Sequence, residues 1–385
     1  MLTASDSGAN MKKVCIYCQT WESGGIEAFL HNVLQHMDLS DIQVDIVADR
    51  LKGSIFTDGL KALGVTFREL SGSSRALAQN YRRFSKLLEE QRYDVVHLNV
   101  FQALPLAYLS LAKRKGVPLR IAHSHNTGLR KSATRPVKYL LHWFAKELFT
   151  GSATDLWACS TPAAEFLFSK KQMKKRPCRF VPNGIDVAKF QFRADVREHT
   201  RKELGLCNQF VVGSVGRLCG QKNQSFLLDV FAEIVRKRPD SRLLLVGEGE
   251  DKTALRQRAE ALGITEQVIF YGLSNQVETL LWAMDVFVFP SLFEGLGIAG
   301  VEAQAAGLPV VCSDRVPVQA RVLDRVHALP LDAGAKVWAD AILALAGTPR
   351  TGEEAAQVRA AGFDIVDVAP RIKMFYRGGP DHGRA

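Results

Sequence analysis

The sequence predicts an α/β protein made of two doubly wound domains with parallel sheets. Short runs of β-branched and aromatic residues alternate with longer helical patterns, which is typical of βαβ units. The length of 385 residues exceeds the roughly 250–300 residues that one hydrophobic core supports, so two domains are expected. A polar, charged stretch over residues 191–208 interrupts the alternation near the middle of the chain.

Six strands are expected in the first half, because six short segments are rich in β-branched or aromatic residues and bounded by turn residues. They are Val14–Cys18, Val44–Ala48, Val65–Leu70, Asp94–Asn99, Leu119–His123 and Leu156–Ser160. Helical patterns lie between them, for example Ile26–Met37 and Ala76–Gln91. Thr161-Pro162 predicts another helix start, since a capping hydroxyl precedes proline in the first turn.

The alternation breaks at Val181–Asp186, where proline, asparagine and glycine follow one another, and it resumes at Phe210–Gly216. The next expected strands are Leu243–Val246, Val268–Tyr271, Val286–Pro290 and Val310–Ser313. We therefore expect a first domain over residues 11–186 and a second over residues 187–365. Ligands of such sheets bind beyond the carboxyl ends of the strands, so the strand-to-helix loops are where function is expected.

Composition excludes several classes of protein. With 47% hydrophobic and 23% charged residues the chain is neither disordered nor fibrous. Seven scattered cysteines do not form a disulfide pattern, and residues 1–10 lack the layout of a signal peptide. The longest apolar stretch, Leu98–Ala112, is too short to span a bilayer. A cytoplasmic location is therefore expected.

Positive charge is concentrated in the first half. Residues 1–190 hold 27 Lys and Arg against 16 Asp and Glu, a net charge of +11, whereas the second half is close to neutral. The segment Arg130–Lys146 mixes basic residues with Tyr139, Trp143 and Phe144. That mixture is typical of a helix on an anionic membrane surface, although an amphipathic helix packed on the sheet would also fit. No nucleic-acid-binding module is present, so nucleic acid is not an expected partner.

Two glycine-containing loops follow strands and open into helices. The first carries Gly24 and Gly25, which let a ligand approach the backbone at a helix N-terminus. The second begins at Gly216 and carries Arg217 and Lys222, five residues apart. A guanidinium and an ammonium on one short loop are suited to a diphosphate. The alternatives are an ordinary tight turn for the first loop and two solvated cations for the second.

A third loop carries two glutamates. Glu294 ends a strand-to-helix loop, and Glu302 lies eight residues later in an otherwise apolar helix, Ile298–Gly307. A carboxylate in apolar surroundings requires hydrogen-bond donors, and the vicinal hydroxyls of a ribose are suitable. Between the glutamates, the backbone N–H groups of Gly295, Leu296 and Gly297 are available to a phosphate or sugar oxygen. The alternative for Glu302 is a structural hydrogen bond to the backbone.

A fourth loop carries His123 and His125 at the end of a strand. We interpret the pair as orienting substrate hydroxyls or as structural; a metal pair is disfavoured because no Cys, Asp or Glu lies near it in the sequence. The sequence contains no Asp-x-Asp, the usual carboxylate pair for a metal–diphosphate complex. It also lacks a Gly-x-x-x-x-Gly-Lys-Ser/Thr loop and a Gly-x-Gly-x-x-Gly after the first strand, which argues against an NTPase or a simple nicotinamide enzyme.

Taken together, these motifs resemble those of the retaining group 1 glycosyltransferases of GT-B fold, in the bacterial capsular and exopolysaccharide branch. The resemblance rests on Gly24–Glu27, His123–Asn126, Pro182–Asp186, Gly216-Arg217-Leu218 with Lys222, and Glu294 with Glu302. It implies two facing Rossmann-like domains, with the acceptor bound by the first and a nucleotide-diphosphate sugar by the second. It also implies a C-terminal helix over residues 366–377 that returns to the first domain.

The resemblance further assigns roles to individual residues. Arg217 and Lys222 would hold the diphosphate leaving group, Glu294 the donor sugar and Glu302 the ribose. Gly25 would approach the phosphate or the acceptor, and one of His123 and His125, with His125 preferred, would face the reacting sugar. Transfer would proceed with retention and without a metal or other cofactor.

The expected partners are a donor, for which a UDP-sugar is favoured, a glycan or polyprenyl-linked acceptor in surface polysaccharide synthesis, and an anionic membrane surface. Two alternatives remain open from sequence alone. One is a GT-B epimerase that acts on a nucleotide-sugar without an acceptor. The other is a catalytically silent scaffold that binds a nucleotide-sugar.

Overall fold

The computed structural model describes residues 11–129 and 134–378, and in it the chain divides into two compact units. Unit 1 comprises residues up to Gly184 together with those from Ile365 onward, and unit 2 is Ile185–Asp364. These boundaries lie within two residues of 186 and 365, where the two expected domains end.

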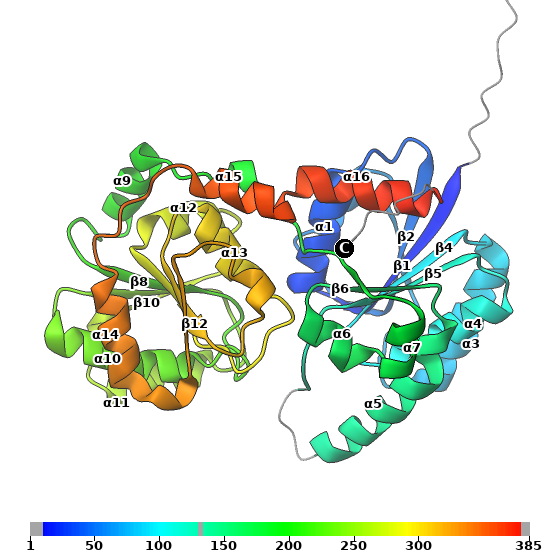
Figure 1. Ribbon diagram of the computed structural model, residues 1–385, viewed down its shortest axis with the longest axis horizontal. Coiled ribbons are helices and arrows are strands. Elements are labelled where there is room, and N and C mark those ends of the chain that lie inside the picture. The colour runs from blue at the N-terminus through cyan, green and yellow to red at the C-terminus, as the bar shows by residue number, and fades with distance from the viewer. Residues whose placement is uncertain (1–10, 130–133, 379–385) are drawn as a thin grey trace, which may run out of the picture. The chain divides into compact units, whose positions relative to one another are not determined.

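Unit 1 contains a seven-stranded sheet in the order β3-β2-β1-β4-β5-β6-β7, and every paired neighbour is parallel (Figure 1). Its strands are β1 (Lys12–Trp21), β2 (Ile42–Leu51), β3 (Thr66–Glu69), β4 (Val95–Val100), β5 (Leu119–Ser124), β6 (Asp155–Ala158) and β7 (Arg179–Phe180). Its helices are α1 (Gly25–Gln35), α2 (Thr57–Ala62), α3 (Leu77–Gln91), α4 (Ala107–Arg114), α5 (Arg135–Phe149), α6 (Thr161–Leu167), α7 (Lys170–Lys175) and α16 (Ile365–Tyr376).

Unit 2 contains a six-stranded parallel sheet in the order β10-β9-β8-β11-β12-β13. Its strands are β8 (Val211–Val215), β9 (Arg242–Val246), β10 (Val268–Gly272), β11 (Val286–Phe289), β12 (Val310–Ser313) and β13 (Val326–Leu329). Its helices are α8 (Val187–Phe190), α9 (Ala194–Glu203), α10 (Gln224–Lys237), α11 (Lys252–Ala261), α12 (Val277–Ala283), α13 (Ile298–Ala305), α14 (Gly334–Ala344) and α15 (Glu354–Val358).

The two sheets confirm the predicted fold class of two doubly wound, Rossmann-like domains. In each sheet the strand order reverses beside the first strand of the unit, between β1 and β4 and between β8 and β11. Ligands of open α/β sheets bind at this switch point.

All the expected strands form, and the edge strands β7 and β13 are present in addition. Arg130 and Lys131 lie outside the described residues.

The C-terminal helix α16 packs on unit 1, which is what the resemblance implied for this helix. Ile365, Val368, Ala369 and Ile372 are buried in the hydrophobic core that α1 and β1 also form. Outside the core, the Lys373 ammonium lies 2.9 Å from Asp41 Oδ1 and 2.6 Å from Asp38 Oδ2. Apolar burial and ion pairs therefore hold α16 to a unit from which it is separated by 180 residues of sequence.

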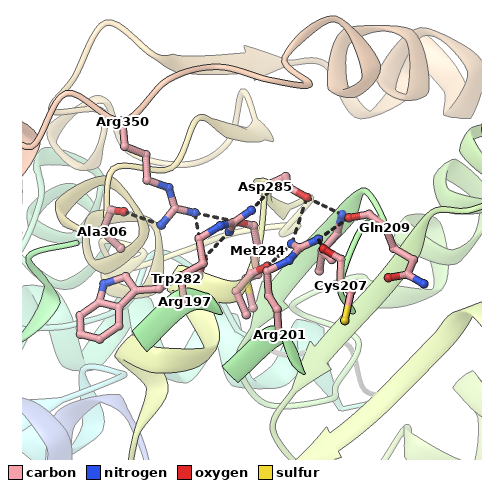
Figure 2. A network of polar contacts seen from close by, with 11 residues as sticks. Arg197, Arg201, Cys207, Gln209, Trp282, Met284, Asp285, Ala306 and Arg350 are labelled. Carbon is pink, nitrogen blue, oxygen red and sulfur yellow. Dashed lines mark hydrogen bonds and ion pairs between the residues drawn. The ribbon is translucent and has the colours of Figure 1, made fainter. Parts of the chain in front are cut away.

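Unit 2 contains a cluster of three arginines at the C-terminal end of α12 (Figure 2). Arg197 and Arg350 donate to the Met284 carbonyl at 2.7 and 2.6 Å, and Arg201 donates to the Ala283 carbonyl at 2.7 Å. Asp285 pairs with Arg197 at 2.6 Å. Cations favour the negative end of a helix dipole, so this cluster caps α12 and its donors are used within the fold.

Candidate functional site

Two loops meet at the switch point of unit 2. The loop from β8 to α10 covers residues 216–223, and the loop from β11 to α13 covers residues 290–297. The Leu292 N–H donates to the Gln221 carbonyl at 2.8 Å, the Gln221 amide to the Phe293 carbonyl at 3.0 Å, and the Asn223 amide to the Pro290 carbonyl at 3.1 Å. These hydrogen bonds hold the second and third predicted loops together.

Lys222 and Glu294 form an ion pair between these loops. The Lys222 Nζ lies 2.7 Å from Glu294 Oε1, and the Ser291 hydroxyl donates to the same oxygen at 2.6 Å. The Glu294 side chain is only 6% exposed and that of Lys222 23% exposed. Two residues that are 72 positions apart in the sequence therefore share one largely desolvated site, in which electrostatic interactions are stronger than in water.

The Arg217 loop is held by the turn that follows β9. Gly216 N–H donates to the Val246 carbonyl at 2.9 Å, and Leu218 N–H donates to the Glu248 carbonyl at 3.0 Å. A Cβ at Gly249 would lie 2.1 Å from the Leu218 carbonyl oxygen, so the contact requires glycine there. The role of this turn in holding the loop was not predicted from the sequence.

Gly216 and Lys222 lie side by side within the loop. Gly216 has a φ of +149°, and a Cβ there would meet Lys222 Cε at 3.3 Å. The aliphatic stem of Lys222 thus passes close to the backbone at the end of β8. Arg217 is half-buried, and its carbonyl accepts a hydrogen bond of 3.0 Å from the Gln224 side chain.

The glycines of the third loop bring the backbone to the start of α13. Gly297 caps that helix with a φ of +92°, in the left-handed region that favours glycine. A Cβ at Gly300 would lie 2.6 Å from the Phe289 ring, so α13 packs tightly on β11. Gly295, Leu296 and Gly297 are all buried, and the Leu296 side chain is a core residue. Only the backbone of Leu296 is available to a ligand.

Glu302 is half-buried on α13, and its carboxylate has no hydrogen-bond or ion-pair partner among the described residues. Burial raises its pKa to about 7; the charges of Lys189 and Lys222 oppose this increase and that of Glu278 adds to it. Lys189 Nζ itself lies 3.2 Å from Glu278 Oε2. The structure thus contains no internal hydrogen bond to the Glu302 carboxylate, which was the alternative from sequence, and the carboxylate can accept donors from a ligand.

In unit 1, the first predicted loop leads into α1. Gly24 occupies the N-cap position with φ −140°, and the Ala28 N–H donates to its carbonyl at 2.9 Å. Gly25 is exposed, and a Cβ there would contact nothing within 4 Å. The N-terminus of α1 is therefore open to a ligand at the switch point of unit 1, although Gly25 is not required by local packing.

The two predicted histidines are part of a larger buried cluster. The rings of His123 and His125 are 4.0 Å apart, and Phe29 of α1 lies 5.4 Å from each. His123 is completely buried, whereas His125 is 8% exposed. Burial lowers the pKa of His125 to about 3, although the polar side chain of Asn183 opposes this shift. His125 is therefore a neutral hydrogen-bonding group at physiological pH.

His97 and Tyr376 complete this cluster and were not predicted from the sequence. His97 Nε2 lies 3.3 Å from His123 Nδ1, and His97 Nδ1 lies 2.6 Å from the Tyr376 hydroxyl on α16. His125 Nε2 lies 2.9 Å from Asn99 Oδ1. A chain of polar contacts thus leads from the C-terminal helix to His123. Within residues 11–129 and 134–378, no group of three His, Cys, Asp or Glu side chains is placed to hold a metal ion.

Comparison with known protein families agrees with this arrangement. The model of the glycosyl transferases group 1 matches residues 196–357, and that of glycosyltransferase family 4 matches residues 23–189. EpsF of Bacillus subtilis, which is named as a glycosyltransferase, is 30% identical over 352 residues, covering 89% of this chain and 90% of EpsF. The chain belongs to the group 1 glycosyltransferases and is an enzyme that uses a nucleotide-sugar donor.

Other relatives act on lipid-linked or lipid acceptors, according to their names. The UDP-Gal:α-D-GlcNAc-diphosphoundecaprenol α-1,3-galactosyltransferase of Escherichia coli is 30% identical over 234 residues, covering 60% of each chain. The α-monoglucosyldiacylglycerol synthase of Streptococcus pneumoniae is 27% identical over 317 residues, covering 77% of this chain and 69% of the synthase.

Solved structures show the same fold. HepE of Anabaena, crystallised with UDP and glucose, matches with a TM-score of 0.75 and 21% identity over 95% of this chain and 99% of HepE. The lipopolysaccharide glycosyltransferase WaaG matches with a TM-score of 0.73 and 19% identity over 95% of this chain and all of WaaG. The fold is therefore GT-B, as predicted.

Proposed function

We propose that this enzyme transfers a sugar, with retention of configuration and without a metal ion, from a UDP-sugar to a glycan or polyprenyl-linked acceptor in surface polysaccharide synthesis. The observation that carries the proposal is the Lys222–Glu294 pair, at 2.7 Å, at the switch point of unit 2. Breaking a glycosyl–phosphate bond develops negative charge on the diphosphate. A cation fixed beside it stabilises that charge without reorganisation.

Lys222 and Arg217 are the residues that would bind the diphosphate. Without a ligand, the ammonium of Lys222 is neutralised by Glu294, whose Oε1 also accepts from Ser291. When a diphosphate binds, it can share the ammonium, and the Glu294 carboxylate becomes available to hydroxyls of the transferred sugar. The guanidinium of Arg217 adds planar, two-pronged recognition of phosphate oxygens.

Glu302 would bind the ribose of the donor. It lies about 1.4 turns along α13 from Gly297 at the helix N-terminus, and its carboxylate has no partner among the described residues. The backbone N–H groups of the glycines there would bind a phosphate or sugar oxygen. Two vicinal hydroxyls can both donate to one carboxylate. Gly24, Gly25 and His125 would contact the acceptor or the reacting sugar, and the fully buried His123 would position His125.

The choice of UDP and of a lipid-linked acceptor is supported by what related proteins are named for. The Escherichia coli relative uses UDP-Gal and a diphosphoundecaprenol acceptor, and HepE was crystallised with UDP-glucose. Retention is proposed from the resemblance of the motifs to the retaining group 1 enzymes, and both glutamates have the roles in donor binding given above. This leaves no carboxylate of unit 2 assigned as a nucleophile, and the acceptor hydroxyl would attack from the face that the leaving group departs.

Thermal unfolding against UDP, GDP, ADP and CMP tests the donor. At 100 times its dissociation constant, a ligand that binds only the folded protein adds about 2.7 kcal/mol. We expect UDP to raise the unfolding temperature of the parent protein and of Lys252→Ala. It should not raise the unfolding temperature of Lys222→Ala. The control removes a lysine of unit 2 whose partner, Glu248, lies 2.6 Å away outside the two loops. A shift with another nucleotide, or one that survives Lys222→Ala, contradicts the assignment.

The reaction is tested with the UDP-sugar and a polyprenyl-diphosphate-linked sugar. The anomeric configuration of the product by NMR decides between retention and inversion, and transfer in excess EDTA decides whether a metal is needed. Conversion of the donor sugar without an acceptor would favour an epimerase instead.

A further inference from the structure

The surface of α5 is unusual in this protein. Seven exposed, large apolar side chains belong to this one helix, with exposed fractions between 37% and 70%: Val137, Tyr139, Leu140, Leu141, Trp143, Phe144 and Leu148. Only His142 and Ala145 of the helix are buried. Contiguous apolar patches of this kind mark interaction sites on soluble proteins. The helix lies at the edge of unit 1 (Figure 1).

The apolar residues of α5 form a face that points away from the protein. At 100° per residue, Val137, Leu140, Leu141, Phe144 and Leu148 fall within about 100° of the helix circumference. The buried residues His142 and Ala145 lie on another side, where the His142 ring accepts from the Ala103 N–H at 3.1 Å. The packing side and the apolar side are therefore different. This differs from the ordinary amphipathic helix weighed from the sequence, whose apolar side would pack on the sheet.

Basic residues are exposed on α5 and on two other helices of unit 1. Lys138 is exposed on α5, and exposed Lys113 and Arg114 end α4, which packs against α5. The four lysines of α7 are exposed as well. The pKa of Lys146 on α5 is lowered mainly by burial; the charges of Glu147 and Glu165 oppose this shift, and that of Lys170 on α7 adds to it. Glu147, the single acidic residue of α5, falls between Trp143 and Leu140 on the helix circumference at 100° per residue.

We propose that the apolar face of α5 (Val137, Leu140, Leu141, Phe144 and Leu148, with Trp143 at its edge) inserts into an anionic membrane surface. The apolar residues would enter the acyl boundary, and the exposed lysines would bind lipid phosphates. A second copy of the chain is a poorer occupant, because a symmetric contact would bring the same basic residues together. In the described part of the chain, no helix is long and apolar enough to cross a bilayer.

This inference rests on the proposed function in one respect, since a lipid-linked acceptor would be presented at such a surface. It defines where on the enzyme the bilayer is met. The donor residues belong to unit 2 and α5 belongs to unit 1, so the two proposals can fail separately.

Tryptophan fluorescence of the full chain tests the proposal directly. The chain has five tryptophans; Trp21, Trp157, Trp282 and Trp338 are at most 4% exposed, whereas Trp143 is 55% exposed. With phosphatidylglycerol vesicles, we expect a blue shift of the emission and quenching by lipids brominated in the acyl chain. Phosphatidylcholine vesicles should bind at least about tenfold more weakly, since each basic residue near an anionic surface contributes about 1 kcal/mol.

A matched pair of variants locates the contact. Leu140→Glu with Phe144→Glu should abolish the blue shift and the co-sedimentation with vesicles. Leu273→Glu with Val318→Glu should leave both unchanged, because these two residues of unit 2 are 69% and 68% exposed and add the same charge. All four positions are on the surface, where substitutions change stability little.

Two results would overturn the membrane assignment. One is co-sedimentation without any change in Trp143 emission, which would indicate adhesion by charge alone. The other is a dimer in solution in which Trp143 is shielded from iodide. The same dimer would have to become a monomer in the Leu140→Glu, Phe144→Glu variant. Stabilisation by UDP is measured on the same samples. If UDP stabilises neither the parent protein nor any variant, the donor proposal is contradicted and the membrane result is unaffected.

Discussion

At the scale of single residues, Glu302 is a group of the donor site whose charge responds to pH in the working range. Burial raises its pKa to about 7 from an ordinary value of 4.5. A carboxyl group with a raised pKa binds more protons in the folded than in the unfolded protein between these values. The ligand-free protein therefore loses stability from Glu302 as the pH rises from 4.5 to 7.

Binding of UDP should show the opposite dependence. If ribose hydroxyls donate to the Glu302 carboxylate, UDP favours its ionised form, and affinity should fall about tenfold per pH unit below 7. Calorimetric titration with UDP between pH 5.5 and 8.5 measures this slope and the proton released. Glu302→Gln has no titrating group at this position. Subtracting its slope of UDP affinity against pH from that of the parent protein therefore corrects for the ionisation of UDP itself. Equal slopes for both would refute the role of Glu302.

The residues show what sequence patterns can and cannot predict. Lys222 and Glu294 were both identified as candidates because each follows a strand, but their direct contact depends on β8 and β11 being neighbours. His97 was missed because a single histidine inside a strand resembles any core residue. Its role emerges only from its contacts with His123 and with Tyr376, which is 279 positions away in the sequence.

At the scale of elements, the turn after β9 supports the diphosphate loop. A Cβ at Gly249 would lie 2.1 Å from the Leu218 carbonyl, whereas a Cβ at Gly220 in the same loop would meet nothing within 4 Å. We expect Gly249→Ala to displace the Arg217 loop, lower stability by about 3 kcal/mol and remove the UDP shift. Gly220→Ala should change neither by much. Denaturant titration of both variants with and without UDP measures these effects. If Gly249→Ala and Gly220→Ala have the same stability and the same response to UDP, the loop is not held by this turn.

The C-terminal helix is the second element with a defined role, because Tyr376 of α16 contacts His97 at 2.6 Å. Tyr376→Phe removes the hydroxyl and leaves the buried His97 nitrogen without its partner, which should cost about 1–2 kcal/mol. The transfer rate should fall while UDP affinity stays the same, because the donor residues are in unit 2. Nitrogen NMR of the histidine rings should show a changed tautomer at His97. An unchanged spectrum would mean that the Tyr376 hydroxyl does not determine the tautomer of His97 and that the contact contributes packing alone.

Elements were easier to predict from sequence than their partners. The central strands form where β-branched runs predicted them, because strands buried on both faces need continuous apolar residues. The missed strands β7 and β13 lie at sheet edges, and β7 has only two residues. The other two edge strands, β3 and β10, were predicted, so an edge position alone does not hide a strand. The expected amphipathic helix forms as α5, but the sequence left open which of its sides packs on unit 1.

At the scale of the whole molecule, the chain contains two separate hydrophobic cores, and α16 belongs to the core of unit 1 although it follows unit 2 in the sequence. Two cores need not unfold in one step, so a single free energy of unfolding is not assumed for this protein. A ligand that binds one unit stabilises that unit directly. Both donor loops are in unit 2, and therefore the effect of UDP should be local.

Hydrogen exchange measured in increasing denaturant tests this locality. With UDP at 100 times its dissociation constant, amides of β8 and β11 should be protected by about 2.7 kcal/mol more, while those of β1 and α16 should keep their ligand-free protection. Lys222→Ala should remove the difference in unit 2 and leave unit 1 as it was. Equal gains in β1, α16 and β8 would mean that the two units unfold together, so the stabilising effect of the donor would belong to the whole chain rather than to the unit that binds it.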